Sequence, residues 1–280
     1  MNRRANERPT ERPKKLYPFG FVVAAGFLAT LAIIALFAQY VAPYDPIAQN
    51  LKATFAPASL AHPLGTDNIG RDVLSRTIWG ARPALLGVII TLITTALTGI
   101  PWGLAAGYLG GFTDLALMRV ADALLVFPGI ILALVLTTIL GPSLQSAMVA
   151  LGIVYAPVLA RVVRSGVLAV RHRDYITVTR LYGYSALYRM RHHLLPNALA
   201  PCIVQLTLIA GMSLLAQTGL GFLGIGLKPP YPSWGGSLAE SFRYIIINPG
   251  ASFAPGATVA LTVLALYRIG DELRDRIQHH

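Results

Sequence analysis

Long apolar stretches separated by shorter polar segments run through this chain. A helix that crosses the hydrocarbon core of a bilayer needs roughly 20 mostly apolar residues. Segments of this kind cover approximately residues 19–41, 84–108, 115–140, 144–163, 196–220 and 253–269. The pattern predicts an all-α integral membrane protein with six transmembrane helices, in which residues 1–18 precede one membrane domain, residues 19–280.

The polar segments between these apolar stretches differ in length. Residues 42–82 are Pro-rich and polar, and their end, GRDVLSRTIWGAR, predicts a short helix that leads into the second span. The sequences LGGFTD and GPS predict turns before and after the third span. A second long connection, which begins GFLGIGLKPPYPSWGGS, precedes the last span.

Composition supports a membrane protein. Apolar residues make up 55% of the 280 residues and charged residues only 12%, whereas soluble domains are about 25% charged. The net charge of +11 is compatible with nucleic-acid binding, but arginine in cytoplasmic loops explains it without a nucleic acid. We therefore expect a lipid bilayer, and no nucleic acid, among its partners.

The distribution of basic residues predicts the orientation. The N-terminal segment, the connection between spans four and five, and the C-terminal tail are all rich in arginine. With six spans these three regions fall on one side of the membrane, and the positive-inside tendency makes that side the cytoplasm. The first apolar run is long enough to span, and no small-residue cleavage site follows it, so it predicts an anchor.

The residues needed for catalysis or metal binding are not evident. None of the four lysines follows a glycine, so the chain has no phosphate-binding loop and a partner must supply any ATP hydrolysis. Cys202 is the only cysteine, so no internal disulfide forms. His192 and His193 are adjacent and point about 100° apart on a helix. His279 and His280 close the chain as a tail. We expect no catalytic residue, cofactor or metal.

A few polar residues lie within the apolar stretches. Asp122 follows Arg119 by three residues, so we expect the two to form an ion pair on one helix face. A secondary transporter would need a relay of acidic or histidine residues through the membrane, and Asp122 is the main acidic residue there. Gln205 and Gln217 in the fifth span are candidates for lining a translocation path, with structural hydrogen bonds as the equal alternative.

The basic connection, residues 171–196, predicts two short helices. The first begins at Asp174, Gly183 breaks it, and Ser185 caps the second. Apolar residues recur at helical spacing, namely Tyr175, Val178, Leu181 and Tyr182 in the first helix and Leu187, Met190 and Leu194 in the second. Pro196 fits the first turn of the following span. Three interpretations of this segment compete: a helix that lies on anionic lipid, a plain basic loop, and a protein-docking element. Composition alone favours the helix on lipid.

The sequence DYITVTRLYGYSALYRMRHHLLPN resembles the cytoplasmic coupling loop, or EAA loop, of ABC importer permeases. The spacing matches at Gly183 and at Leu195–Pro196. Four further stretches resemble the subgroup that handles dipeptides, oligopeptides and nickel, and in particular its second permease. They are HPLGTDNIGRDVLSRTIWGAR, MRVADALLVFP, TGLGFLGIGLKPPYPSWG and GDELRDRI, in the order that the family has them.

The sequence departs from the family pattern at three places. Thr177, Val178 and Thr179 occupy the E-A-A positions, so the signature letters are missing although the frame remains. His193 stands at the usual apolar site before Leu-Pro, as it also does elsewhere in the subgroup. Gln217 replaces an acidic residue that often precedes TGL. Two β-branched residues in place of alanines predict a bulkier docking helix.

The resemblance implies a type I ABC importer permease bundle with a cytoplasmic coupling helix, in the plasma membrane of a prokaryote with both termini in the cytoplasm. The implied partners are a homologous second permease, two ATP-binding subunits and an extracytoplasmic solute-binding protein. The implied coupling residues are Asp174, Tyr175, Val178, Thr179, Leu181, Tyr182, Gly183, Tyr184, Ser185, Leu187 and Pro196. Tyr231 and Trp234 are candidates for docking the binding protein.

Di- and oligopeptides are the expected substrates, again from the resemblance. Nickel chelates or other small solutes are the alternative substrates. An ion-coupled secondary transporter and a membrane-embedded enzyme are the competing classes, and dependence of transport on ATP and on a co-expressed ATPase discriminates both from an ABC importer.

Overall fold

The computed structural model describes residues 19–278, all of whose regular elements are helical. The helices are α1 Phe19–Leu36, α2 Ala38–Val41, η1 Leu51–Ala53, α3 Val73–Leu109, α4 Gly111–Val126, α5 Gly129–Leu140, α6 Leu144–Val170, α7 Asp174–Leu181, α8 Ala186–Arg189, η2 Met190–Leu194, α9 Leu195–Phe222, α10 Trp234–Phe242 and α11 Gly250–Gln278. The predictions for residues 1–18 and for the terminal histidines lie outside the described residues.

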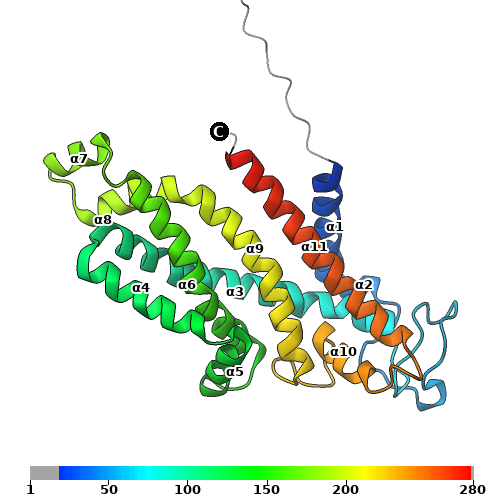
Figure 1. Cartoon of the computed structure of the whole chain (residues 1–280). Helices are drawn as coiled ribbons and strands as arrows, with labels where there is room; N and C mark the ends of the chain where they lie inside the picture. The colour runs from blue at the N-terminus through cyan, green and yellow to red at the C-terminus, as the bar shows by residue number, and fades with distance from the viewer. Residues whose placement is uncertain (1–18, 279–280) are drawn as a thin grey trace, which may run out of the picture.

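The predicted membrane architecture is confirmed, with one change in shape. Five helices of the described residues are long and apolar enough to cross a membrane, and the number is six when the bent pair α4 and α5 counts as one span. Figure 1 shows the start of α1, the end of α11 and the pair α7–α8 at one end of the bundle. The loop before α3 and α10 lie at the other end (Figure 1). The basic regions described by the structure therefore gather at one end.

The third span is not the continuous helix that was predicted. α4 and α5 meet at an angle of 99°, and the break falls at Phe127 and Pro128, which have extended backbone ψ angles of 138° and 120°. A proline disfavours the α conformation of the residue before it. The ring at Pro128 thus ends α4 at Val126 and redirects the chain before α5 begins.

The second span is longer than the hydrophobic pattern indicates. The predicted short helix and the predicted span form one helix of 37 residues, α3, which contains Pro83 and Pro101. Asp72 is its N-cap and accepts a hydrogen bond from the backbone N–H of Ser75 at 2.7 Å. A capping carboxylate satisfies one of the free N–H groups of the first turn. The helix ends at Gly110, whose φ of 67° suits glycine.

α3 and α6 pack closely along a row of small residues. Gly99, Gly103 and Gly107 are spaced by four, so they share one face of α3. A Cβ built at Gly99 would lie 2.8 Å from the backbone oxygen of Ala156 on α6. Two turns and one turn before Gly99, Thr91 and Thr95 donate hydrogen bonds to backbone oxygens of α6. Small residues that let backbones approach, together with hydroxyl donors, hold helices together in a bilayer.

Substituting Gly103 by valine is expected to destabilise the bundle. A Cβ at Gly103 would lie 2.5 Å from the Cβ of Val163, so α3 and α6 must separate, at a cost of about 1–3 kcal/mol. Gly26→Val on α1 is the matched control, because nothing lies within 4 Å of a Cβ there. Thermal unfolding of the purified variants measures the difference, and equal melting temperatures would show that the packing is not this tight.

α9 occupies the centre of the bundle. It packs against α3, α6, α10 and α11, and its side chains enter three clusters of buried apolar residues. One of these clusters includes Ile176 of α7, packed with Leu194, Ala198 and Cys202. The fold therefore joins the short helix α7 directly to the central span.

Candidate functional site

The predicted helix–glycine–helix segment is present between α6 and α9. Within α7, Ile176 is only 1% exposed and packs in the cluster that also holds Val167, Val170 and Leu194. Thr179 donates its hydroxyl hydrogen bond to the backbone oxygen of Ile176 at 2.7 Å. Ile176 lies outside the predicted apolar stripe of this helix, yet it anchors α7 to the membrane domain.

A glycine turn fixes the end of α7. Gly183 has a φ of 75°, in the left-handed region, and the backbone N–H of Tyr184 bonds to the oxygen of Thr179 at 3.2 Å. This arrangement is the Schellman motif, in which the residue in the left-handed region is usually glycine. Ser185 then caps α8 and accepts from the N–H of Tyr188 at 3.2 Å. The predicted break and cap are confirmed.

α7, the turn after it and α8 present apolar side chains to their surroundings. Leu181 is 81% exposed, Tyr182 80% and Leu187 71%, and Tyr175 and Val178 are exposed to a smaller extent. Large apolar side chains that stay exposed together mark an interaction surface. We call these five residues the docking face; all of them belong to the predicted coupling set.

Aromatic rings connect this segment to the π turn η2 that precedes α9. Tyr184 and Tyr188 are stacked with ring centroids 4.7 Å apart, and Tyr188 stacks on His192 at 4.3 Å. The ring of Tyr175 on α7 lies edge-on to His193 at 6.3 Å. Offset and edge-on aromatic pairs each contribute roughly 0.5–1.5 kcal/mol beyond area burial. His192 and His193 thus serve packing, a role that their adjacency does not reveal.

α8 continues into α9 without a break. Residues Met190–Leu194 form a π-helical turn between them, and the backbone N–H of Leu195 bonds to the oxygen of Met190. Pro196 lies in the first turn of α9, as predicted, although α8, this turn and α9 form one helical run from Ala186 to Phe222. π turns of this kind occur as local insertions within α-helices. α8 is therefore joined to the central span by continuous helical backbone.

A buried cluster of charged residues joins the loop before α3 to α10 at the other end of the molecule. Arg71 is 4% exposed and donates through Nε to Asp67 and through Nη2 to Glu240, both at 2.5 Å. Arg76, also 4% exposed, donates to the same Glu240 oxygen at 3.2 Å. We call these four residues the outer clamp. The spacing of Asp67 and Arg71 in the sequence indicates a local pair, but nothing in it indicates Glu240.

The two candidates for docking a binding protein have different environments. Tyr231 is 59% exposed and stays a candidate. Trp234 is only 2% exposed, and its indole N–H donates to the backbone oxygen of Thr77 at 2.9 Å. The prediction for the Trp234 side chain was wrong, because this ring fills the space against Gly80 between α10 and α3.

The predicted ion pair between Arg119 and Asp122 does not form. Asp122 on α4 instead accepts from Arg161 of α6 at 2.6 Å, and Arg119 makes no ion pair within residues 19–278. A second pair joins the same two helices, since Arg164 binds Asp114 through Nε and Nη2 at 2.5 and 2.6 Å. Packing of α4 against α6 thus supplies a partner 39 residues away that the sequence spacing does not indicate.

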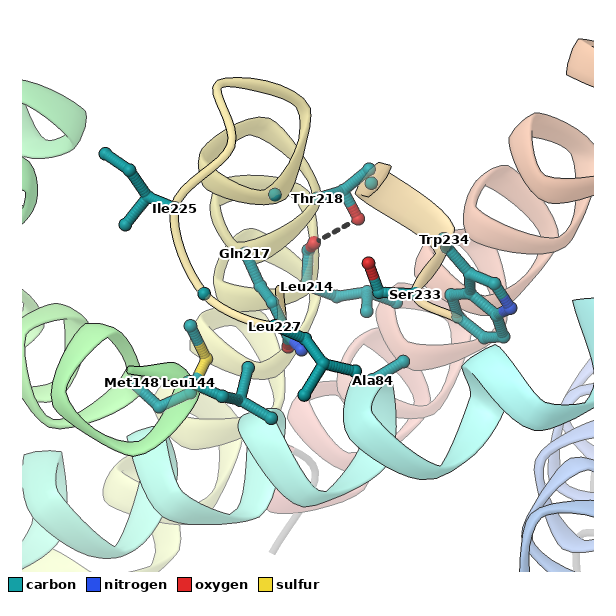
Figure 2. A pocket seen from close by; sticks show the side chains of 13 residues that line it. Ala84, Leu144, Met148, Leu214, Gln217, Thr218, Ile225, Leu227, Ser233 and Trp234 are labelled. Carbon is teal, nitrogen blue, oxygen red and sulfur yellow. Dashed lines mark hydrogen bonds between the residues drawn. The ribbon is translucent and has the colours of Figure 1, made fainter. Parts of the chain in front are cut away.

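The two glutamines of α9 also differ. The side-chain amide of Gln217 donates to the backbone oxygen of Pro83 on α3 at 2.8 Å, while its Oε1 is buried without a hydrogen-bond partner among the described residues. Figure 2 shows Gln217 among apolar side chains of a pocket, near Ala84 of α3 and Met148 of α6. Gln217 thus makes a structural hydrogen bond, which was the predicted alternative to lining a translocation path. Gln205 stays a candidate for the path, partly exposed on α9.

These features define a helical membrane protein with a helix–glycine–helix segment at one end and the outer clamp at the other. The chain belongs to the family described as "Binding-protein-dependent transport system inner membrane component", whose model matches residues 99–279. The predicted family is therefore confirmed. The chain is an inner-membrane permease component of a binding-protein-dependent transport system.

Curated relatives cover almost the whole chain. The dipeptide transport system permease protein DppC of Alkalihalophilus pseudofirmus is 37% identical over 95% of this chain and 86% of its own. The DppC of Escherichia coli K12 is 41% identical over 92% and 88%, and the di/tripeptide permease DppC of Pseudomonas aeruginosa 40% over 90% and 85%.

A solved structure shows the same fold. A chain of the MetNI methionine ABC transporter in an inward-facing conformation superposes with a TM-score of 0.57, covering 72% of this chain and 95% of its own. Its sequence identity to this chain is 22%.

Proposed function

We propose that this chain is a permease subunit of an ATP-driven ABC importer that takes up di- and oligopeptides. It forms the translocation path with a homologous second permease, in the plasma membrane of a prokaryote. The names of its relatives, dipeptide and di/tripeptide permeases, support the substrate class. The gathering of α7, the start of α1 and the end of α11 at one end supports a cytoplasmic location of both termini (Figure 1).

The docking face is the observation that carries the proposed ATPase contact. Its exposed apolar side chains lie on α7, on Tyr182 in the turn that ends this helix, and on Leu187 of α8. The turn is fixed by the left-handed conformation of Gly183. A helix that lays an apolar face into a groove is a recurrent mode of protein recognition. Two ATP-binding subunits, one for each permease, bind by such grooves, and the permease itself hydrolyses nothing.

The contacts behind the docking face explain how it transmits movement. Ile176 fixes α7 to the core, the ring of Tyr175 contacts His193, and α8 runs unbroken into α9. When ATP binding brings the two ATPases together, α7 and α9 move as one body. Rigid-body displacement of this kind opens a central path to each side of the membrane in turn.

Replacing Leu181 by aspartate tests the ATPase contact. A charge at this exposed apolar side chain leaves the fold intact. It weakens binding of the ATP-binding subunit by roughly 2 kcal/mol, which is about 30-fold in affinity. Leu60→Asp is the matched control, because Leu60 is fully exposed in the loop at the opposite end. Co-purification with the co-expressed ATP-binding subunits measures the effect; equal recovery of both variants would exclude α7 as the docking helix.

Uptake by the reconstituted importer tests the substrate class. Proteoliposomes with both permeases, the ATP-binding subunits and the binding protein are expected to accumulate a labelled dipeptide only when ATP is present. Accumulation of a nickel chelate in preference to the dipeptide would show that the chelate, and not a peptide, is the substrate. Uptake that follows an ion gradient without ATP would contradict an ABC importer.

A further inference from the structure

An open groove lies at the end of the molecule that carries α10. It encloses about 1010 Å³, including space open to solvent, between the end of α9, the loop 223–233 and α10. One wall is apolar and contains Phe222, Leu227 and Pro229. Its charged lining consists of Arg76, Glu240 and Arg243. The groove thus combines apolar side chains with both signs of charge.

Two of the charged residues, Glu240 and Arg243, are separated by one turn of helix. Arg243 follows Glu240 by three residues and has helical dihedral angles, φ −62° and ψ −23°. Side chains three apart on a helix have Cβ atoms about 5–6 Å from one another. Glu240 is nevertheless directed to the outer clamp, where its Oε2 accepts from both Arg71 and Arg76. The two residues therefore present their charges side by side without neutralising each other.

Both charges have capacity for a ligand. Oε1 of Glu240 accepts no hydrogen bond among residues 19–278, and 30% of the side chain is exposed. The exposed guanidinium of Arg243 makes no hydrogen bond or ion pair within the same residues. Arg71 and Arg76 balance Asp67 and Glu240, so Arg243 adds one uncompensated positive charge. A ligand with a carboxylate for Arg243 and a cationic group for Oε1 of Glu240 would give each of these two side chains a partner.

We propose that this groove is a receiving site for the main chain of a short peptide. Arg243 binds the C-terminal carboxylate, Glu240 Oε1 accepts from the N-terminal ammonium, and a side chain rests against the apolar wall at Phe222 and Leu227. Two extended residues span at most about 7 Å, a length that suits charges one helical turn apart. Because the recognition uses the termini, side-chain identity matters little. The inference rests on the proposed peptide uptake.

Photolabelling tests the site in the assembled transporter. The complex of both permeases and the ATP-binding subunits, in nanodiscs without binding protein, is irradiated with alanyl-photoleucine, and the labelled residues are mapped by mass spectrometry. We expect label within residues 222–231 and competition by unmodified alanyl-leucine. Its C-terminal amide and its N-acetyl derivative should each compete about tenfold less well, because each loses one charge-assisted hydrogen bond.

Two variants separate the site from a general charge effect. Arg243→Gln should take up about tenfold less label and no longer discriminate the acid from the amide, since the carboxylate loses its charged partner. Lys228→Gln removes one positive charge from the same loop at a residue that does not line the groove, and it should label like the wild type. Equal labelling of the two variants, equal competition by acid and amide, or no label within 222–231 would overturn the proposal.

The same preparation shows which claim has failed. If the wild-type system takes up dipeptides in an ATP-dependent way while residues 222–231 stay unlabelled, the groove proposal alone is wrong. If the system takes up no dipeptide at all, the proposed substrate class is wrong as well.

Discussion

Replacing Gly183 by proline is expected to remove the ATP-binding subunits from the complex while the chain still inserts into the membrane. Proline holds φ near −65°, whereas Gly183 has a φ of 75°. The substitution therefore breaks the Schellman turn and the bond from Tyr184 N–H to Thr179. α7 loses its fixed direction, and the docking face no longer matches a single groove. We expect ATP-dependent uptake to be abolished.

Gly183→Asn is the matched control for this change. Asparagine enters the left-handed region more readily than other residues with a Cβ, and a Cβ at Gly183 meets nothing within 4 Å. The asparagine variant should retain its ATP-binding subunits and most of its uptake. Co-purification and uptake, both normalised to the amount of inserted permease, measure the two variants. If the proline variant keeps its ATPases, the segment is a basic loop on the lipid surface.

Replacing Asp67 by alanine is expected to give the largest loss of stability at the outer end. Asp67 is 8% exposed and accepts from Arg71 Nε and from the backbone N–H groups of Ile69 and Arg71. Its removal leaves two buried arginines, Arg71 and Arg76, with the single carboxylate of Glu240 between them. Breaking a buried ion pair by removing one partner costs about 3–5 kcal/mol.

Asp45→Ala controls for the loss of an acidic residue from the same loop. Asp45 is exposed, and within residues 19–278 its Oδ1 accepts only from the backbone N–H of Ile47, at 2.9 Å. Its substitution should change the free energy of unfolding by less than about 1 kcal/mol. Thermal unfolding of the two purified variants in one detergent compares them, and similar melting temperatures would show that the outer clamp contributes little.

The docking segment was predictable because its signals are local. Gly183, the Ser185 cap and the apolar spacing each act within one or two helical turns, and the helices formed where these signals place them. The direction of each side chain was less predictable. Ile176 reaches the core while Leu181 remains exposed, and this choice depends on how α6 and α9 pack beside α7.

Predictions that depended on distant partners failed more often. Asp122 forms its ion pair with Arg161 of the neighbouring helix and not with Arg119 of its own helix. Trp234 is buried although it lies in a polar, glycine-rich stretch of sequence. In both cases a residue close in space but remote in sequence decided the outcome. Glu240 joins the outer clamp across 169 residues from Arg71, and no spacing rule reaches that far.

The sequence by itself determined the membrane class, the apolar spans, the end with basic residues and the helix–glycine–helix segment. These depend on hydrophobicity, charge and backbone preference, which each residue carries wherever it lies. Only the tertiary structure decided the 99° bend between α4 and α5, the ion pairs between helices and the groove beside α10. These features depend on contacts between separate helices, and the packing of the helices determines which atoms are in contact.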